Sequence, residues 1–295
     1  MTVKQQHVSC GEIKDGLRVL GIEAGDRIIV HSSLKSFGYV DGGPETVIRA
    51  LQETVTANGL LMCPTFNHDR IFLKDGKPLK GAFFDPAESP TVDGIIPETF
   101  RRMEGVYRSL NPTHACAAWG QGAEEIVASH HRVLTMGSGS PIALLEQQGG
   151  KVVLLGVGYG ANTLKHVIEQ TFGCPCLGPR TEAHDIKLPD NRIVEGRTWG
   201  WREIGCPVAG PAEPIRTLME AAHYSRSGNI GEARVIVFRM TNCRKVIEDL
   251  LTHGWRGRPP CRRCRVRARK MPWTVESDWD VAKNCLKPDS PAHGY

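Results

Sequence analysis

The chain has 295 residues, which is enough for one large domain or two small ones. Hydrophobic residues make up 40% and charged residues 23%, and no run of about 18 apolar residues predicts a membrane span. The net charge of +5 comes from residues 256–270, where eight basic residues occur without an acidic one. The start of the chain lacks a secretory pattern, so we expect a cytoplasmic protein whose ten cysteines are reduced.

Strands and helices alternate along the chain. Ser9 and Glu12 form a capping-box pattern for a first helix, and Pro44 suits the first turn of a later one. Periodicity and turn residues predict strands at 27–31, 60–63, 114–119, 151–158 and 234–240, and helices at 94–104, 123–131, from Ser140, 162–171, 213–223 and up to Leu251. This alternation predicts a three-layer α/β/α domain with a mostly parallel central sheet and additional β elements in the C-terminal half.

The segment 154–170, LLGVGYGANTLKHVIEQ, passes from a strand through three glycines into a helix. Residues 156–161 fit the G-x-G-x-x-A fingerprint of a dinucleotide site. That fingerprint also needs a second strand ending in an acidic residue about 20 residues further on. The sequence at that place, GCPCLGPRTEAHD, is no buried strand, which disfavours dinucleotide binding.

His166 and Glu169 are the candidate catalytic residues of this segment. On a helical wheel they lie opposite the apolar side of the helix, so we expect His166 in solvent or in a polar cleft. Glu169 follows three residues later and can accept a hydrogen bond from one ring nitrogen, which would fix the tautomer and raise the basicity. From these residues alone, His166 can be either a solvated surface histidine or a general base.

Six segments occur in a characteristic order: 25–51 with H-S-S-L and a double glycine, 60–66 (LLMCPTF), 84–102 (FDPAESPTVDGIIPETFRR), 108–120 (RSLNPTHACAAWG), 137–145 (GSGSPIALL) and 151–169 (KVVLLGVGYGANTLKHVIE). Together they resemble the sequence blocks of the aminoglycoside 3-N-acetyltransferases, also called the antibiotic N-acetyltransferase family. The chain departs from the family pattern at Ala115, where a serine is usual.

The resemblance implies transfer of acetyl from acetyl-CoA to the 3-amino group of an aminoglycoside's deoxystreptamine ring, and so aminoglycoside resistance. It implies His166 as the active-site histidine and Glu169 as its partner. The implied coenzyme A site comprises His31, Ser32, Ser33, Leu34, Ser36 and Ser140, and the implied acceptor site comprises Thr65, Asp69 and Asn111. The same chemistry on a non-antibiotic amino-sugar or a biosynthetic amine is the alternative, because the irregular segment 64–92, expected to wall the acceptor site, carries little motif information.

Residues 255–295 lie outside the resemblance, so we expect a catalytic domain at 1–254 followed by a basic, cysteine-containing tail. Cys261 and Cys264 are half of a possible zinc site, but no ligands at a standard spacing complete it, and we predict no metal. Few aromatic residues interrupt the arginines, which makes nucleic-acid binding a less favoured function. We expect no membrane partner, and a monomer and a homodimer are both compatible with the sequence.

Overall fold

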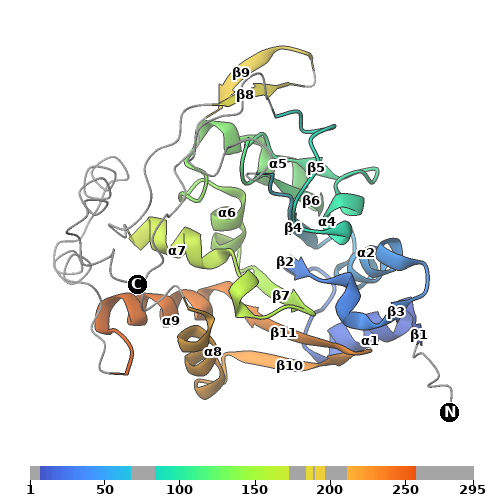
Figure 1. Ribbon diagram of the computed structural model, residues 1–295, viewed down its shortest axis with the longest axis vertical. Coiled ribbons are helices and arrows are strands. Elements are labelled where there is room, and N and C mark those ends of the chain that lie inside the picture. The colour runs from blue at the N-terminus through green and yellow to red at the C-terminus, as the bar shows by residue number, and fades with distance from the viewer. Residues whose placement is uncertain (1–6, 68–83, 173–183, 189, 197–210, 257–295) are drawn as a thin grey trace.

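The computed structural model describes residues 7–67, 84–172, 184–188, 190–196 and 211–256 (Figure 1). The α-helices of these residues are α1 (Cys10–Val19), α2 (Gly43–Val55), α4 (Ile95–Phe100), α5 (Ala123–Ala128), α6 (Pro141–Gln147), α7 (Leu164–Phe172), α8 (Ala212–Ala221) and α9 (Met240–His253). Short 3₁₀ helices are η1 (Leu34–Phe37), η2 (His130–Arg132) and η3 (Tyr159–Ala161). The strands are β1 (His7–Val8), β2 (Arg27–Ser32), β3 (Tyr39–Val40), β4 (Leu60–Pro64), β5 (Tyr107–Arg108), β6 (Cys116–Gly120), β7 (Lys151–Leu155), β8 (His184–Lys187), β9 (Ile193–Gly196), β10 (Ser225–Ile230) and β11 (Ala233–Arg239).

The central sheet has seven strands in the order β10-β11-β7-β2-β4-β6-β5. Strand β2 pairs in parallel with β7 on one side and with β4 on the other. The outer pairs, β10–β11, β11–β7, β4–β6 and β5–β6, are antiparallel, so the sheet is mixed rather than mostly parallel. Alternation of strands with helices predicts that helices connect parallel strands. It gave no indication of the β10–β11 hairpin, because the β10 sequence, SRSGNI, has no apolar run.

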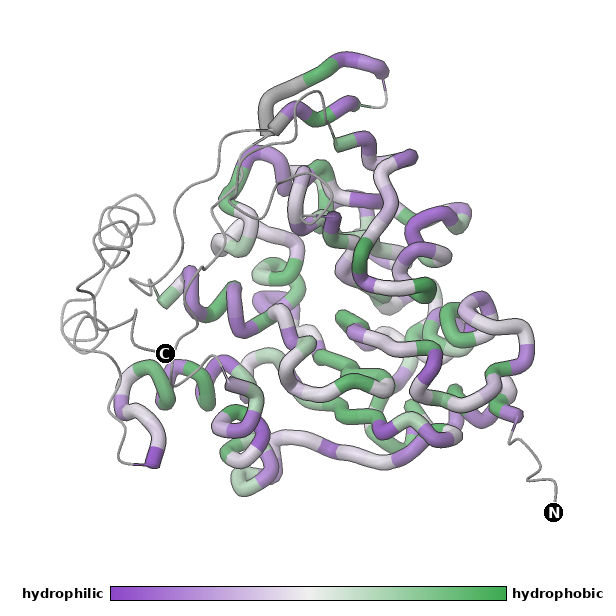
Figure 2. The backbone as a smooth tube through the Cα atoms, in the orientation of Figure 1, coloured by the Kyte–Doolittle hydropathy of each residue, from purple (hydrophilic) through white to green (hydrophobic). Residues whose placement is uncertain are grey.

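Helices cover both faces of this sheet, and Figure 2 shows the apolar strands between them. Alternate residues of β7 point to opposite faces: Val152 and Leu154 pack with the helices α5 to α9, whereas Val153 and Leu155 pack with α1, α2 and α4. Continuous apolar runs such as that of β7 are typical of strands buried on both faces. The mixed α/β class is therefore confirmed.

The helix starts follow their predicted caps. In α1 the Glu12 N–H donates to Ser9 Oγ, and the Ser9 N–H donates to Glu12 Oε2. In α6 the Ser140 hydroxyl accepts from the Ala143 N–H, with Pro141 in the first turn. Among the described residues, no helix has the length and apolar character that crossing a membrane requires.

Candidate active site

The carboxyl ends of β2 and β7 lie side by side and form the floor of the candidate site. His31 is opposite Leu154 in the register, and Ser32 is opposite Leu155. The Ser33 N–H donates to Leu155 O at 3.0 Å. The H-S-S-L turn therefore lies directly beside the glycine loop that follows β7, at the edge where open α/β sheets bind ligands.

Gly156 ends β7 and turns the chain toward α7. Its φ of +73° favours glycine, and a Cβ there would lie 2.5 Å from Ser36 Cβ. Ser36 Oγ donates to Gly156 O at 2.7 Å. This close approach packs η1 on the glycine loop, and it explains why β7 stops at Leu155, earlier than the strand predicted for 151–158.

Asn162 fixes the start of α7. Its Oδ1 accepts from the Leu164 N–H at 3.2 Å, and its Nδ2 donates to Cys243 Sγ on α9 at 3.3 Å. Three residues before Asn162, in η3, the Tyr159 ring stacks on Phe238 of β11. The first turn of α7, which carries His166, is thus held by contacts to both α9 and the sheet.

His166 and Glu169 are in contact, as predicted. His166 Nδ1 lies 2.9 Å from Glu169 Oε2. The Glu169 side chain is 0% exposed and that of His166 12%, so the polar side of the predicted helix is buried rather than solvated. Because a carboxylate only accepts, Nδ1–H is the donor, and Nε2 is the ring nitrogen that carries the lone pair. A buried carboxylate in this position stabilises a positive charge on the imidazole.

His31, near the end of β2, is a buried neutral imidazole beside the start of α7. Burial, and then the positive charge of Lys165, lower the pKa of His31 to about 3. Its Nε2 lies 3.4 Å from Thr163 Oγ1, just before α7. The neighbouring Ser32 hydroxyl is buried and has no hydrogen-bond partner among the described residues. Buried hydroxyls normally have a partner, so a polar ligand group would fit at Ser32.

The other predicted site residues have contacts within the protein. Ser140, Thr65 and Asn111 are each fully buried. Thr65 Oγ1 lies 3.1 Å from Ala115 O, and Asn111 Oδ1 accepts from the backbone N–H groups of residues 113 and 114. This Asn111 turn also delays the start of β6 to Cys116, two residues later than predicted. Leu34 begins η1, and Asp69 lies outside the described residues.

Comparison with known proteins identifies the family of this fold and site. The family model described as aminoglycoside 3-N-acetyltransferase matches residues 29–252. The chain belongs to this family. Aminoglycoside N(3)-acetyltransferase VIII of Streptomyces fradiae is 33% identical over 254 residues, which cover 78% of this chain and 87% of the relative. Aminoglycoside N(3)-acetyltransferase VII of Streptomyces paromomycinus is 35% identical over 242 residues, which cover 74% and 82%.

Solved structures agree with the assignment to the aminoglycoside 3-N-acetyltransferases. AAC-IIIb in binary complex with CoASH has a TM-score of 0.72 at 26% identity, covering 86% of this chain and 100% of that chain. AAC-VIa bound to sisomicin has a TM-score of 0.69 at 26% identity, covering 83% and 98%. Both alignments include most of the chain, so the likeness extends beyond the motifs that carried the resemblance.

In this member of the family, Arg108 is a half-buried residue that the sequence did not single out. Its guanidinium donates to the carbonyl groups of Thr65, Pro86 and Ser89, and it lies 5.0 Å over the Phe84 ring. Burial lowers the pKa of Arg108 to about 9, so the side chain is protonated at neutral pH. Arg108 therefore joins the end of β4 to residues 84–89, on the side of the site expected to receive the acceptor.

A buried hydrogen-bond chain supports the same region. Ser109 Oγ accepts from the Cys116 N–H and lies 2.8 Å from His130 Nδ1. His130 Nε2 lies 2.9 Å from Thr135 O, a group that only accepts. His130 is therefore the Nε2–H tautomer, with Nδ1 accepting from the Ser109 hydroxyl, and protonation of Nδ1 would break this chain.

The buried imidazole predicts acid sensitivity. Burial lowers the pKa of His130 to about 4, against about 6.5 for a free imidazole. Since the folded pKa is the lower one, the contribution to stability is complete above pH 6.5 and is lost toward pH 4, by about 1.4 kcal/mol per pH unit. We expect urea denaturation to show the free energy of unfolding falling from pH 6.5 to 5, and falling less steeply in His130→Gln. Equal slopes in the two proteins would contradict this account.

Proposed function

We propose that this chain transfers the acetyl group of acetyl-CoA to the 3-amino group of an aminoglycoside's deoxystreptamine ring and thereby confers resistance. The observation that carries the proposal is the buried His166–Glu169 pair beside the H-S-S-L turn. Membership of the aminoglycoside 3-N-acetyltransferase family supports the reaction, and relatives bound to CoASH and to sisomicin support the two substrates.

In this mechanism, His166 Nε2 removes the proton that the acceptor amine must lose. The amine nitrogen attacks the thioester carbonyl carbon, and the carbon–sulfur bond breaks as the tetrahedral intermediate collapses. The coenzyme A thiolate leaves and takes up the proton from the imidazolium. Glu169 holds the ring by Nδ1 and compensates the imidazolium charge in a buried site, where charge compensation is strongest.

We place the pantetheine or pyrophosphate part of acetyl-CoA against the H-S-S-L turn. Ser32 offers a buried hydroxyl without a partner among the described residues, with His31, Ser33 and Leu34 beside it. Ser36 and Ser140 complete the proposed surface, although the hydroxyl of each also has a partner within the protein. A buried, neutral His31 suits a neighbour of uncharged pantetheine.

Replacing Ser32 and Ser33 together by alanine is expected to raise the KM for acetyl-CoA. Each lost hydrogen bond costs about 0.5–1.5 kcal/mol, so the loss of two corresponds to a rise in KM of roughly 5–100-fold. Steady-state kinetics with each substrate varied in turn measure the effect. A raised KM for the acceptor with an unchanged KM for acetyl-CoA would show that the H-S-S-L turn contacts the acceptor and not acetyl-CoA.

The acceptor side is proposed to include Thr65, Asn111 and Asp69. Thr65 and Asn111 act through the walls they hold, because their side chains are bonded within the protein. Asp69 would face the ammonium groups of the acceptor. Coenzyme A release with a panel of aminoglycosides, with and without a free 3-amine, tests the acceptor. Equal rates with and without a free 3-amine would favour the alternative acceptor, another amino-sugar or a biosynthetic amine.

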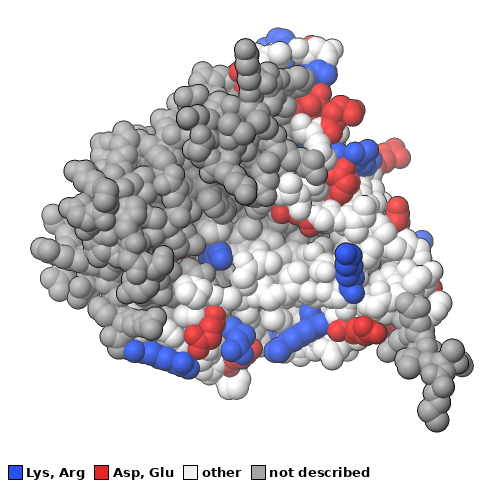
Figure 3. All heavy atoms as spheres, in the orientation of Figure 1, with Lys and Arg blue, Asp and Glu red and all other residues white. Residues whose placement is uncertain are grey.

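We propose a three-layer α/β/α catalytic domain over residues 1–254, and the two residues that follow it also contact this body. Trp255 packs against the hydrophobic core, and Arg256 lies 3.3 Å from Glu213. The segment with Cys261 and Cys264 lies outside the described residues. On the face in Figure 3, basic and acidic side chains of the described residues are interspersed and offer nucleic acid no continuous basic surface.

Truncation after Arg256 is therefore expected to leave kcat within a few-fold of the full chain, as exposed termini usually allow. The same two samples test the other functions of the tail. Salt-dependent DNA or RNA binding lost on truncation would support the nucleic-acid function. One zinc per full-length chain, lost on truncation, would overturn the predicted lack of metal. The cytoplasmic location and the monomeric or homodimeric state stay predictions.

A further inference from the structure

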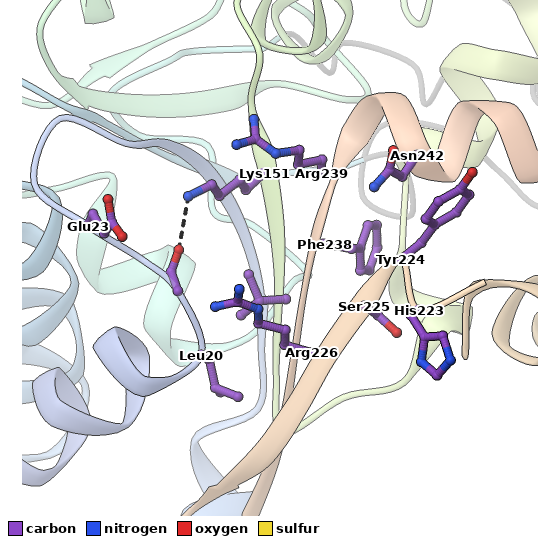
Figure 4. A pocket seen from close by; sticks show the side chains of 12 residues that line it. Leu20, Glu23, Lys151, His223, Tyr224, Ser225, Arg226, Phe238, Arg239 and Asn242 are labelled. Atoms are coloured by element: carbon purple, nitrogen blue, oxygen red, sulfur yellow. Dashed lines mark hydrogen bonds between the residues drawn. The ribbon is translucent and has the colours of Figure 1, made fainter. Parts of the chain in front are cut away.

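A pocket of about 280 Å³ opens at the edge of the sheet where β7 begins and β11 ends (Figure 4). Lys151 at the start of β7 lines it, together with Arg239 at the end of β11 and Arg226 on β10. His166 follows the other end of β7, and five residues of strand separate the two edges by about 13 Å. The pocket is therefore distinct from the site of acetyl transfer.

The strand register brings the three basic residues to one face of the sheet. Arg239 is directly opposite Lys151, and Arg226 is opposite Val237, two residues before Arg239. Residues two apart on a strand share a face, so the three side chains project on the side that α1 covers. Like charges directly opposite each other repel and are destabilising unless an anion compensates them.

Only part of this positive charge is compensated within the described residues. Lys151 Nζ lies 2.6 Å from Asp26 Oδ2 and 2.9 Å from Gly21 O. The side chains of Arg226 and Arg239 form no ion pair and no hydrogen bond with any other described residue. The lining has a single carboxylate, that of Glu23, so two guanidinium groups exceed the negative charge around them.

The surroundings of the two arginines also favour an anion. Gly21, with φ +88°, lets Arg226 approach closely, since a Cβ there would lie 2.7 Å from Arg226 Nη1. The Asn242 amide adds a neutral donor to the lining. α9 begins directly after Arg239 without a side-chain cap, and the positive end of its dipole adds to the field.

We propose that this pocket binds a small phosphate monoester. The two arginines carry the proposal, because a guanidinium fork matches phosphate oxygens in a bidentate manner and their charge exceeds that of Glu23. The volume lies just below the range of about 300–1,000 Å³ that is typical of small-molecule sites, which suits a ligand the size of a small metabolite. The proposal does not depend on the acetyl-transfer reaction.

Calorimetric titration of the full chain with glycerol 3-phosphate, at constant ionic strength in chloride buffer, tests it. We expect one binding site, and an affinity at least about tenfold weaker in Arg226→Gln/Arg239→Gln, since hydrogen bonds to charged groups contribute about 1.5–3 kcal/mol each. Arg49→Gln removes an exposed charge of α2 outside the pocket and should change the affinity less than about twofold.

Absence of binding by the wild type at about 10 mM ligand would overturn the proposal, as would equal affinities of the wild type and the double variant. Equal affinities would place the ligand elsewhere, for example where coenzyme A binds. Amide chemical-shift changes in the wild type give a second measurement that needs no variant. They should gather at residues 225–226 and 239–242, and changes confined to residues 31–36 would refute the assignment. Stronger binding of succinate than of glycerol 3-phosphate would refute the phosphate class.

Discussion

Replacing His166 by alanine is expected to lower kcat by about 10²–10⁴-fold, the usual contribution of a positioned general base. Acetyl-CoA affinity should change little, because the imidazole acts on the amine and not on the cofactor. His253→Ala is the matched control. His253 Nδ1 lies 2.8 Å from Asp249 Oδ1 in a similar histidine–carboxylate pair, but its side chain is 71% exposed on α9.

Steady-state and single-turnover kinetics of the two variants decide between a catalytic and a structural His166. A near-normal kcat in His166→Ala would exclude the general base. An equal loss of activity in His253→Ala would show that the assay reports damage to the fold, which circular dichroism of both variants measures directly. Glu169→Gln should have the smaller effect, because its amide oxygen can still accept from Nδ1–H but carries no charge to compensate the imidazolium.

Sequence patterns predicted the local structure well where one local interaction, such as a helix cap or an apolar run, determines it. Ser9 and Glu12 form the predicted capping box, and the apolar runs 27–31 and 151–155 are the two central strands. Pairing direction was harder to predict, because it depends on long-range contacts. Nothing in the polar sequence of β10 indicates that it forms a hairpin with β11 and occupies the edge of the sheet.

In the candidate site, too, local contacts were predictable from the sequence and long-range contacts were not. Spacing alone predicted the contact of His166 with Glu169, since residues three apart on a helix are neighbours. Burial of Glu169 was not predictable from the helical wheel, because α7 packs against both α6 and α9 and buries a side that reads as polar. Arg108 was missed for a related reason: a half-buried arginine that donates to carbonyl groups has no periodic signal, and only the assembled loops reveal its contacts.

The second large effect is expected at Gly156, the residue that ends β7 and begins the loop leading to α7. Gly156→Ala places a Cβ within 2.5 Å of Ser36 Cβ at a φ of +73°. Strain at positive φ and overpacking together should lower the free energy of unfolding by about 2–4 kcal/mol. The displaced η1 should also raise the KM for acetyl-CoA, because Ser36 and the H-S-S-L turn move with it.

Gly158→Ala, two residues away in the same loop, is the matched control with the opposite expected sign. Gly158 has a φ of −100°, which alanine adopts readily, and no heavy atom lies within 4 Å of the added Cβ. Alanine at such a position stabilises by about 0.4–1 kcal/mol, since it restricts the unfolded chain. Urea denaturation of both variants measures the difference. Similar stabilities would show that Ser36 and η1 yield to the new methyl group, and the close contact at Gly156 would then have no part in holding the H-S-S-L turn beside His166.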